Sequence, residues 1–289
     1  MIYDFLVAPF AEFAFMRRAL VAALALAMGC GPVGVILVLR RMSLVGDAMS
    51  HAVLPGAAVG FVIAGLSLFW MSLGGFVAGL LVAVLSGLVA RVTALREDAS
   101  FAAFYLIALA TGVALVSTRG SNVDLMRVLF GTVLAVDDAA LLLVAGISTL
   151  TLLVLAAIYR PLVIECFDPG FLNAAGARGG LYHVAFMVLV VLNLVAGFQA
   201  MGTLMAVGMM MLPATAARFW AREVWPTCVA AVGLGSGAGA AGLLLSFHLN
   251  LPSGPAIVLT AGALYLASLA VGRYDSLMTR YLPRTHLRA

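Results

Sequence analysis

Asp47 and His51 are the two residues whose types and spacing could support chemistry in this chain of 289 residues. They lie in the stretch RRMSLVGDAMSHAVLPGAAVGF, residues 40–61, at the start of a long apolar run. Residues four positions apart share one face of a helix, with Cβ atoms about 5–6 Å apart, so a carboxylate oxygen and an imidazole nitrogen could converge on one cation. Such donors suit Zn²⁺ or Mn²⁺ better than an alkali ion.

Pro55 adds a second local feature. A proline inside a helix cannot donate a hydrogen bond to the carbonyl four residues earlier, here that of His51, and it bends the helix. Such a backbone is tolerated in a membrane only where it is buried in protein or lines a cavity. The spacing also fits a boundary role, in which Asp47 caps a helix and His51 hydrogen-bonds to it. From spacing alone, the metal site and the cap both stay open.

The elements that must position this pair are membrane helices. The chain is 64% hydrophobic and 10% charged, with a mean hydropathy of +1.16, whereas about a quarter of the residues in soluble domains are charged. We therefore expect an all-α, polytopic transmembrane bundle with about nine spans, in a range of eight to ten. The apolar segments fall near residues 18–39, 46–66, 70–90, 100–118, 134–159, 181–200, 203–220, 224–247 and 253–272.

Residues 1–15 are predicted to form an interfacial segment, residues 16–272 the membrane domain, and residues 273–289 a cytoplasmic tail. Orientation follows from arginine, because loops rich in basic residues stay in the cytoplasm. Twelve of the 16 arginines fall on one side if the loop with Arg40 and Arg41 is cytoplasmic. We therefore expect a cytoplasmic C-terminus in a bacterial inner membrane.

Composition also excludes several functions. All 16 basic residues are arginine, and a P-loop needs a lysine to reach the nucleotide phosphates, so ATP hydrolysis would have to come from a partner subunit. The net charge of +4 is explained by orientation signals, not by nucleic-acid binding. The spacing of Cys30, Cys166 and Cys228 does not match that of a thiolate metal site. The sequence also lacks the H-E-x-x-H motif that would indicate an intramembrane hydrolase.

A cytoplasmic connection near residues 163–178 contains a second candidate element. Asp168 and Pro169 are typical of a helix start, since Asp caps free N–H groups and Pro suits the first helical position. Phe167, Phe171 and Leu172 would form its apolar face. Periodicity alone also allows an ordinary amphipathic connector.

Five ordered motifs resemble the membrane subunits of bacterial zinc and manganese ABC importers. They are LRRMSLVGDAMSHAVLPGAAVGF (residues 39–61), VLFGTVLAV (128–136), CFDPGFLNAAGA (166–177), QAMGTLMAVGMMMLPATAARF (199–219) and LPSGPAIVL (251–259). The resemblance implies the type II importer fold, a homodimer, two separate ATPase subunits and a periplasmic or surface metal-binding protein. It also implies that Asp47 and His51 contact the metal.

By the same resemblance, the segment from Phe167 to Gly176 looks like the coupling helix that docks into the ATPase. Gly170 and the Ala174-Ala175-Gly176 run depart from the usual pattern, which implies weaker or partner-specific coupling contacts. His248 is a weaker metal candidate, because a lone histidine at a membrane interface is typical of a polar tip at the lipid headgroups. Met201, Met205, Met209, Met210 and Met211 are interpreted as core filler.

The sequence thus predicts an ATP-driven permease that carries Zn²⁺ or Mn²⁺ as cargo and holds no permanent cofactor. Its partners would be an ATPase, a binding protein, a second copy and membrane lipid. One alternative is a type II permease for an iron chelate or siderophore, which needs a wider cavity and no Asp–His pair. Another is a proton-coupled secondary transporter in which Asp47 and His51 relay protons without an ATPase.

Overall fold

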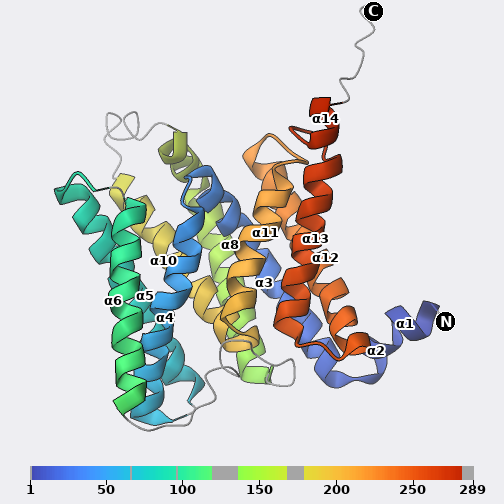
Figure 1. Cartoon of the computed structure of the whole chain (residues 1–289), viewed down its shortest axis with the longest axis horizontal. Helices are drawn as coiled ribbons and strands as arrows, with labels where there is room; N and C mark the ends of the chain where they lie inside the picture. Colours follow the sequence, from blue (N-terminus) through green and yellow to red (C-terminus); the bar gives the residue numbers. More distant parts are fainter. Residues whose placement is uncertain (1, 66, 96, 119–135, 168–178, 282–289) are drawn as a thin grey trace, which may run out of the picture.

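Figure 1 shows the computed structural model, which describes residues 2–65, 67–95, 97–118, 136–167 and 179–281. These residues form helices joined by short turns, with no strand among them. The helices are α1 (Ile2–Leu6), α2 (Ala8–Glu12), α3 (Ala14–Leu39), α4 (Ser43–Ala64), α5 (Leu68–Val92), α6 (Glu97–Thr118), α8 (Asp138–Phe167), α10 (Gly179–Met201), α11 (Thr203–Ala217), α12 (Val224–Leu249), α13 (Ser253–Val271) and α14 (Leu277–Tyr281).

The all-α membrane fold predicted from composition is confirmed. Each of the nine apolar segments falls on a helix, from α3 through α13. Within the described residues, seven of these helices are long and apolar enough to cross a membrane, and shorter apolar helices cover Asp98–Gly112 and Thr203–Ala217. At 1.5 Å per residue, the 15 residues of α11 rise about 22 Å, less than the roughly 30 Å of a bilayer core.

Two groups of helices meet at α10. On one side α4 packs against α5 and α6, and on the other α3 and α11 pack with α12 and α13 (Figure 1). α10 contacts α3, α4, α5, α8 and α11. It is the most buried candidate span, followed by α3. α4 therefore lies between a tightly packed neighbour, α5, and the central helices.

The contact between α4 and α5 depends on glycine. A Cβ atom on Gly56 would collide with the carbonyl oxygen of Gly74 and lie 2.6 Å from the Cβ of Ala78, and a Cβ on Gly60 would collide with the backbone of Trp70. Without these side chains the two backbones approach closely, as small residues allow between membrane helices. This contact fixes the second half of α4.

Two helix boundaries differ from those expected. α3 begins at Ala14, four residues before the expected start of the first span. α8 continues through Pro161 to Phe167, past the expected end at residue 159, so residues 163–167 of the predicted cytoplasmic connection belong to this helix. A proline inside a membrane helix is tolerated when neighbouring helices satisfy the freed backbone group. Glu165, four residues after Pro161, pairs at 2.7 Å with Arg40, the C-cap of α3.

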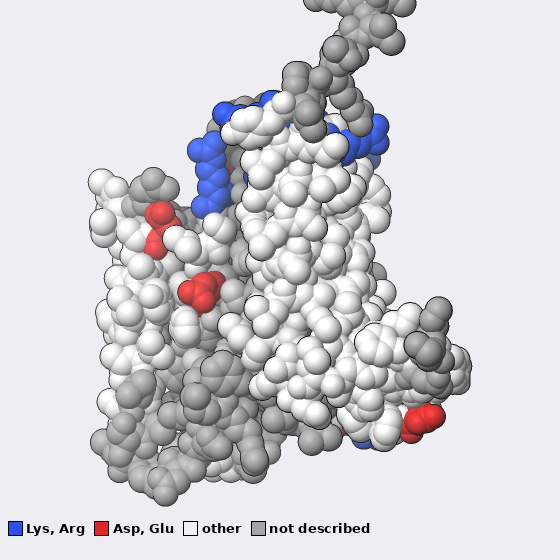
Figure 2. Space-filling model, turned by 45° about the vertical axis from the view of Figure 1, so that its right-hand side comes forward, with Lys and Arg blue, Asp and Glu red and all other residues white. Residues whose placement is uncertain are grey.

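Charged side chains are few and unevenly placed. Figure 2 shows that arginine side chains gather at the end of the molecule near α14. The surface of the helices below them carries almost no charge in this view. α1 and α2 lie at the opposite end from α14 (Figure 1). An odd number of crossings, such as the nine segments give, places the two chain ends in this way.

Candidate metal-binding site on helix α4

Asp47 lies inside α4 and not at its cap. The helix begins at Ser43, its N-cap is Met42, and no side chain caps it. Asp47 is therefore the fifth helical residue, about 6 Å along the axis from Ser43, and His51 is about 12 Å along it. The capping interpretation of Asp47 is wrong, because the free N–H groups of this helix lie in the turn before it.

The side chains of Asp47 and His51 share one face of α4, as their spacing predicted. His51 Nε2 lies 3.7 Å from Asp47 Oδ1, which is too long for a hydrogen bond. The Asp47 side chain is 63% exposed and the His51 side chain 38% exposed. The two donor atoms therefore converge without satisfying each other and can be reached from outside the chain.

The neighbours of this pair come from two other helices. The His51 ring stacks against Tyr105 of α6, with centroids 6.0 Å apart and an interplanar angle of 28°. The Cε atom of Met211 in α11 lies next to Gly46, the residue before Asp47, since a Cβ on Gly46 would be only 2.9 Å from it. Between these neighbours lies what we call the α4 face, a partly exposed stripe one helix wide. It consists of Leu44, Asp47, His51, Leu54 and Ala58.

Pro55 lies inside α4, one turn after His51, and is buried. A Cβ atom on Gly112 of α6 would collide with the Pro55 ring, so the two helices touch at this point. Because Pro55 has no N–H, the carbonyl of His51 loses its usual donor within the helix. Pro55 thus removes the intrahelical donor of the carbonyl next to the imidazole.

One chain offers two side-chain donors on the α4 face. No group of three or more His, Cys, Asp or Glu that could hold a metal ion occurs among the residues that the structure describes. A carboxylate within a membrane is costly unless it faces a cavity or a partner. We therefore expect the exposed Asp47 carboxylate to face a second protein surface, water or an ion at the α4 face.

His248 holds the N-terminal helices. Its ring stacks on Phe5 with centroids 4.0 Å apart and an interplanar angle of 3°, and Nε2 lies 3.0 Å from the Phe5 carbonyl oxygen. Phe247 meets the same ring edge-on. These contacts give His248 a packing role, while its role as a metal ligand stays a prediction.

The predicted coupling residues Asp168, Pro169, Phe171, Leu172 and Gly176 lie outside the described residues. Phe167, the last residue of α8, is 69% exposed, and its role in contacting an ATPase stays a prediction.

The methionines of α10 and α11 are core residues, as the sequence analysis predicted. Met201, Met205, Met209 and Met210 are all at most 1% exposed, and Met211 is half-buried beside α4. Sequence reasoning missed Tyr105 as a neighbour of His51 and Met211 as a neighbour of Gly46, the residue before Asp47. Both lie far from the pair in the chain, so no local spacing could have linked them to Asp47 and His51.

Comparison with known proteins gives concordant results. The chain is 36% identical over 260 residues to the manganese import system permease protein ScaB of Streptococcus parasanguinis, covering 90% of this chain and 91% of the relative. It is 31% identical to the chelated iron transport system membrane protein YfeD of Yersinia pestis, over 93% and 89% of the two chains. The solved structure of PsaBC from Streptococcus pneumoniae in complex with Fab matches with a TM-score of 0.84 at 32% identity, covering 97% of this chain and 99% of that one.

The family model described as the ABC 3 transport family matches residues 12–272, which include every predicted span and the Asp47–His51 pair. The match confirms the family resemblance that the five ordered motifs indicated and agrees with the observed helical fold. This chain belongs to the ABC 3 transport family.

Proposed function

We propose that this chain is the permease subunit of an ATP-driven importer that moves Mn²⁺ or Zn²⁺ across the bacterial inner membrane. The observation that carries the proposal is the convergence of Asp47 and His51 on the exposed α4 face, with donor atoms 3.7 Å apart. One carboxylate oxygen and one imidazole nitrogen suit divalent first-row metals. The manganese permease ScaB, which resembles this chain along 90% of its length, supports the same substrate class.

Two copies of the chain would complete the path. If the α4 faces of two copies oppose each other, two carboxylates and two imidazoles surround one route, and the exposed Asp47 no longer faces lipid. Such ligands must bind loosely, because a closed four-ligand site of the structural type would retain zinc. Transit requires binding that is favourable for capture and weak enough for release.

The energy would come from a separate ATPase, since the chain contains no lysine for a P-loop. A binding protein outside the membrane would deliver the metal, and the segment from Phe167 to Gly176 would contact the ATPase. ATP turnover in the partner would then reorient the two copies and expose Asp47 and His51 to the cytoplasm.

The test is uptake of radioactive manganese and zinc by proteoliposomes that contain the permease, its ATPase and its binding protein. We expect ATP-dependent uptake by the wild type and its loss in Asp47→Asn and His51→Ala, with assembly and basal ATP hydrolysis retained. Asp275→Asn is the matched control, because it removes an exposed carboxylate outside α4 at a left-handed position that asparagine tolerates.

Three results would contradict the proposal. Normal uptake by both α4 variants would remove the pair from the metal path. Uptake of an iron chelate in place of the free ions would favour the chelate permease, a class to which the name of the relative YfeD points. Uptake driven by a proton gradient without ATP would favour the secondary transporter.

A further inference from the structure

Arg40 joins three helices at the arginine-rich end of the molecule. Its Nη2 donates to Glu165 Oε2 of α8 at 2.7 Å, and its Nη1 lies 2.8 Å from His183 Nδ1 of α10. Guanidinium groups only donate hydrogen bonds, so Nδ1 is the acceptor and the proton of the neutral ring lies on Nε2. The guanidinium carbon also sits 5.0 Å from the centre of the Phe186 ring. We call Arg40, Glu165 and His183 the Arg40 triad.

The ion pair of the Arg40 triad is almost removed from solvent, while His183 is half-buried. The side chains of Arg40 and Glu165 are 8% and 14% exposed. Arg40 Nε is buried and finds no hydrogen-bond partner among the described residues. A buried ion pair often adds little to stability, because the cost of desolvation offsets the attraction, whereas loss of one partner leaves the other charge uncompensated. The arrangement is therefore better suited to fixing geometry than to adding stability.

The backbone next to Arg40 leads directly into α4. The Met42 N–H bonds to the Leu37 carbonyl at 2.9 Å, and the Arg41 N–H bonds to that of Val38 at 3.1 Å. With Arg41 at a φ of 58°, these bonds form a Schellman motif, in which a left-handed residue ends the helix. α4 begins at Ser43, so a shift of Arg40 is passed to the turn that carries Asp47.

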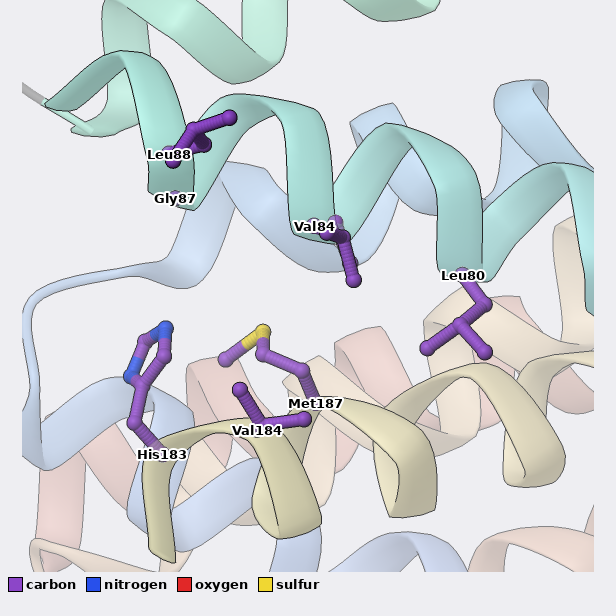
Figure 3. Close-up of a pocket in the computed structure, with 8 residues that line it drawn as sticks. Leu80, Val84, Gly87, Leu88, His183, Val184 and Met187 are labelled. Atoms are coloured by element: carbon purple, nitrogen blue, oxygen red, sulfur yellow. The ribbon is translucent and has the colours of Figure 1, made fainter. Parts of the chain in front are cut away.

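The other two members of the Arg40 triad flank the predicted ATPase-contacting segment. Glu165 precedes residue 168 by three positions, and His183 follows residue 178 by five. On its other side, the start of α10 is loosely packed. Figure 3 shows His183 and Met187 facing Leu88 and Val84 of α5 across a crevice of about 150 Å³. The Arg40 triad thus holds this end of α10 on the side away from the crevice.

We propose that Arg40, Glu165 and His183 are positioning residues that couple the ends of α8 and α10 to Asp47 and His51. Movement of the segment between these two helices, driven by the ATPase, shifts Glu165 and His183 and, through Arg40, turns the start of α4. The inference rests on the proposed function for its ATPase and its metal. The contact that Arg40 makes between the three helices can be measured without the ATPase or the metal.

The first test measures position. Spin labels on Ser43→Cys in α4 and Leu181→Cys in α10 report the distance between the starts of these two helices. Both substitutions are made in a chain that carries Cys166→Ser, and labelled chain is mixed with an excess of unlabelled chain so that only distances within one chain are measured. We expect one narrow distance distribution in the otherwise unchanged chain and a broad one in Arg40→Gln and Glu165→Gln. Arg41→Gln is the matched control, because it removes the neighbouring charge from an exposed side chain outside the Arg40 triad.

The second test measures coupling in proteoliposomes with the ATPase and the binding protein. We expect Arg40→Gln and Glu165→Gln to reduce metal ions transported per ATP hydrolysed by about fivefold or more. The charge exchange Arg40→Glu with Glu165→Arg should restore part of the ratio. His183→Asn, which keeps an acceptor near the Nδ1 position, should stay close to wild type, whereas His183→Ala should not.

Two outcomes would overturn the inference. One is an unchanged distance distribution in both Arg40→Gln and Glu165→Gln. The other is a proportional loss of transport and ATP hydrolysis, with a lower melting temperature and no rescue by charge exchange, because a merely structural role predicts that result. Failure of the wild type to transport any metal would instead contradict the proposed function, while the distance measurement would still decide the positioning role.

Discussion

At the scale of single residues, the α4 face combines one hard oxygen donor with one borderline nitrogen donor. Asp47 and His51 supply these from consecutive turns, and both side chains are partly exposed. Because selectivity among first-row metals depends on ligand type and geometry, it should respond to a change of donor type.

Asp47→Cys is expected to shift transport from Mn²⁺ toward Zn²⁺, because a thiolate is a soft ligand that favours zinc over manganese. The measurement is the ratio of zinc to manganese taken up by proteoliposomes from a mixture of both ions. Asp47→Asn, which keeps an oxygen donor without the charge, should lower uptake of both. A ratio in Asp47→Cys equal to that of the wild type would place metal selection elsewhere.

His248 gives a second prediction at this scale. His248→Phe keeps the stacking on Phe5 and loses both ring nitrogens, so we expect normal uptake if the role is packing. His248→Ala also loses the stacking and should raise amide hydrogen exchange in α1 and α2. If His248→Phe abolished uptake while exchange in these helices stayed normal, the ring would be a metal ligand.

At the scale of helices, the closest contact in the α4 region is the glycine pair Gly56 and Gly74. Gly56→Ala is expected to push α4 from α5, because the new Cβ meets backbone and not a flexible side chain. Overpacking of this kind costs roughly 1–3 kcal/mol, which should appear as a lower melting temperature in detergent.

Gly146→Ala is the matched control for Gly56→Ala. It lies inside α8, where a Cβ would meet nothing within 4 Å, so alanine should be neutral or stabilising through its higher helix propensity. Equal melting temperatures for the two variants would show that α4 and α5 can separate at little cost.

The sequence predicted a helix correctly where a long apolar segment was enough to indicate one. It predicted helix ends less well, because contacts with other helices help to decide where a helix stops. All nine apolar segments became helices, because each must satisfy its backbone within the membrane. The predicted segment ended at residue 159, where the apolar run meets Arg160, whereas α8 continues through Pro161 to Phe167 and Arg40 binds its Glu165.

The candidate site was predictable only in part for the same reason. The Asp47–His51 pair is local, so helical periodicity placed both residues on one face. Tyr105, Met211 and the partners of Arg40 come from helices separated by 50 or more residues, and packing alone brings them together. Pro55 lay between these cases, since its missing backbone hydrogen bond was predictable but its contact with Gly112 was not.

At the scale of the whole molecule, arginine placement and the helix count lead to one orientation. Described arginines near the turns after α3, α11 and α13 lie at the same end, and α1 and α2 lie at the other (Figures 1 and 2). Basic residues remain on the cytoplasmic side, so α14 is expected inside and α1 outside.

This orientation can be tested by labelling intact bacteria with a membrane-impermeant maleimide. The chain would carry either Tyr3→Cys or Tyr281→Cys, both at exposed positions, with Cys166 replaced by Ser and the buried Cys30 and Cys228 retained. We expect Tyr3→Cys to react in intact cells and Tyr281→Cys to react only after the membrane is opened, because nine crossings put the two ends on opposite sides. Reaction of both in intact cells would require an even number of crossings, and would show that α6 or α11, the shorter apolar helices, enters and leaves the membrane on the same side.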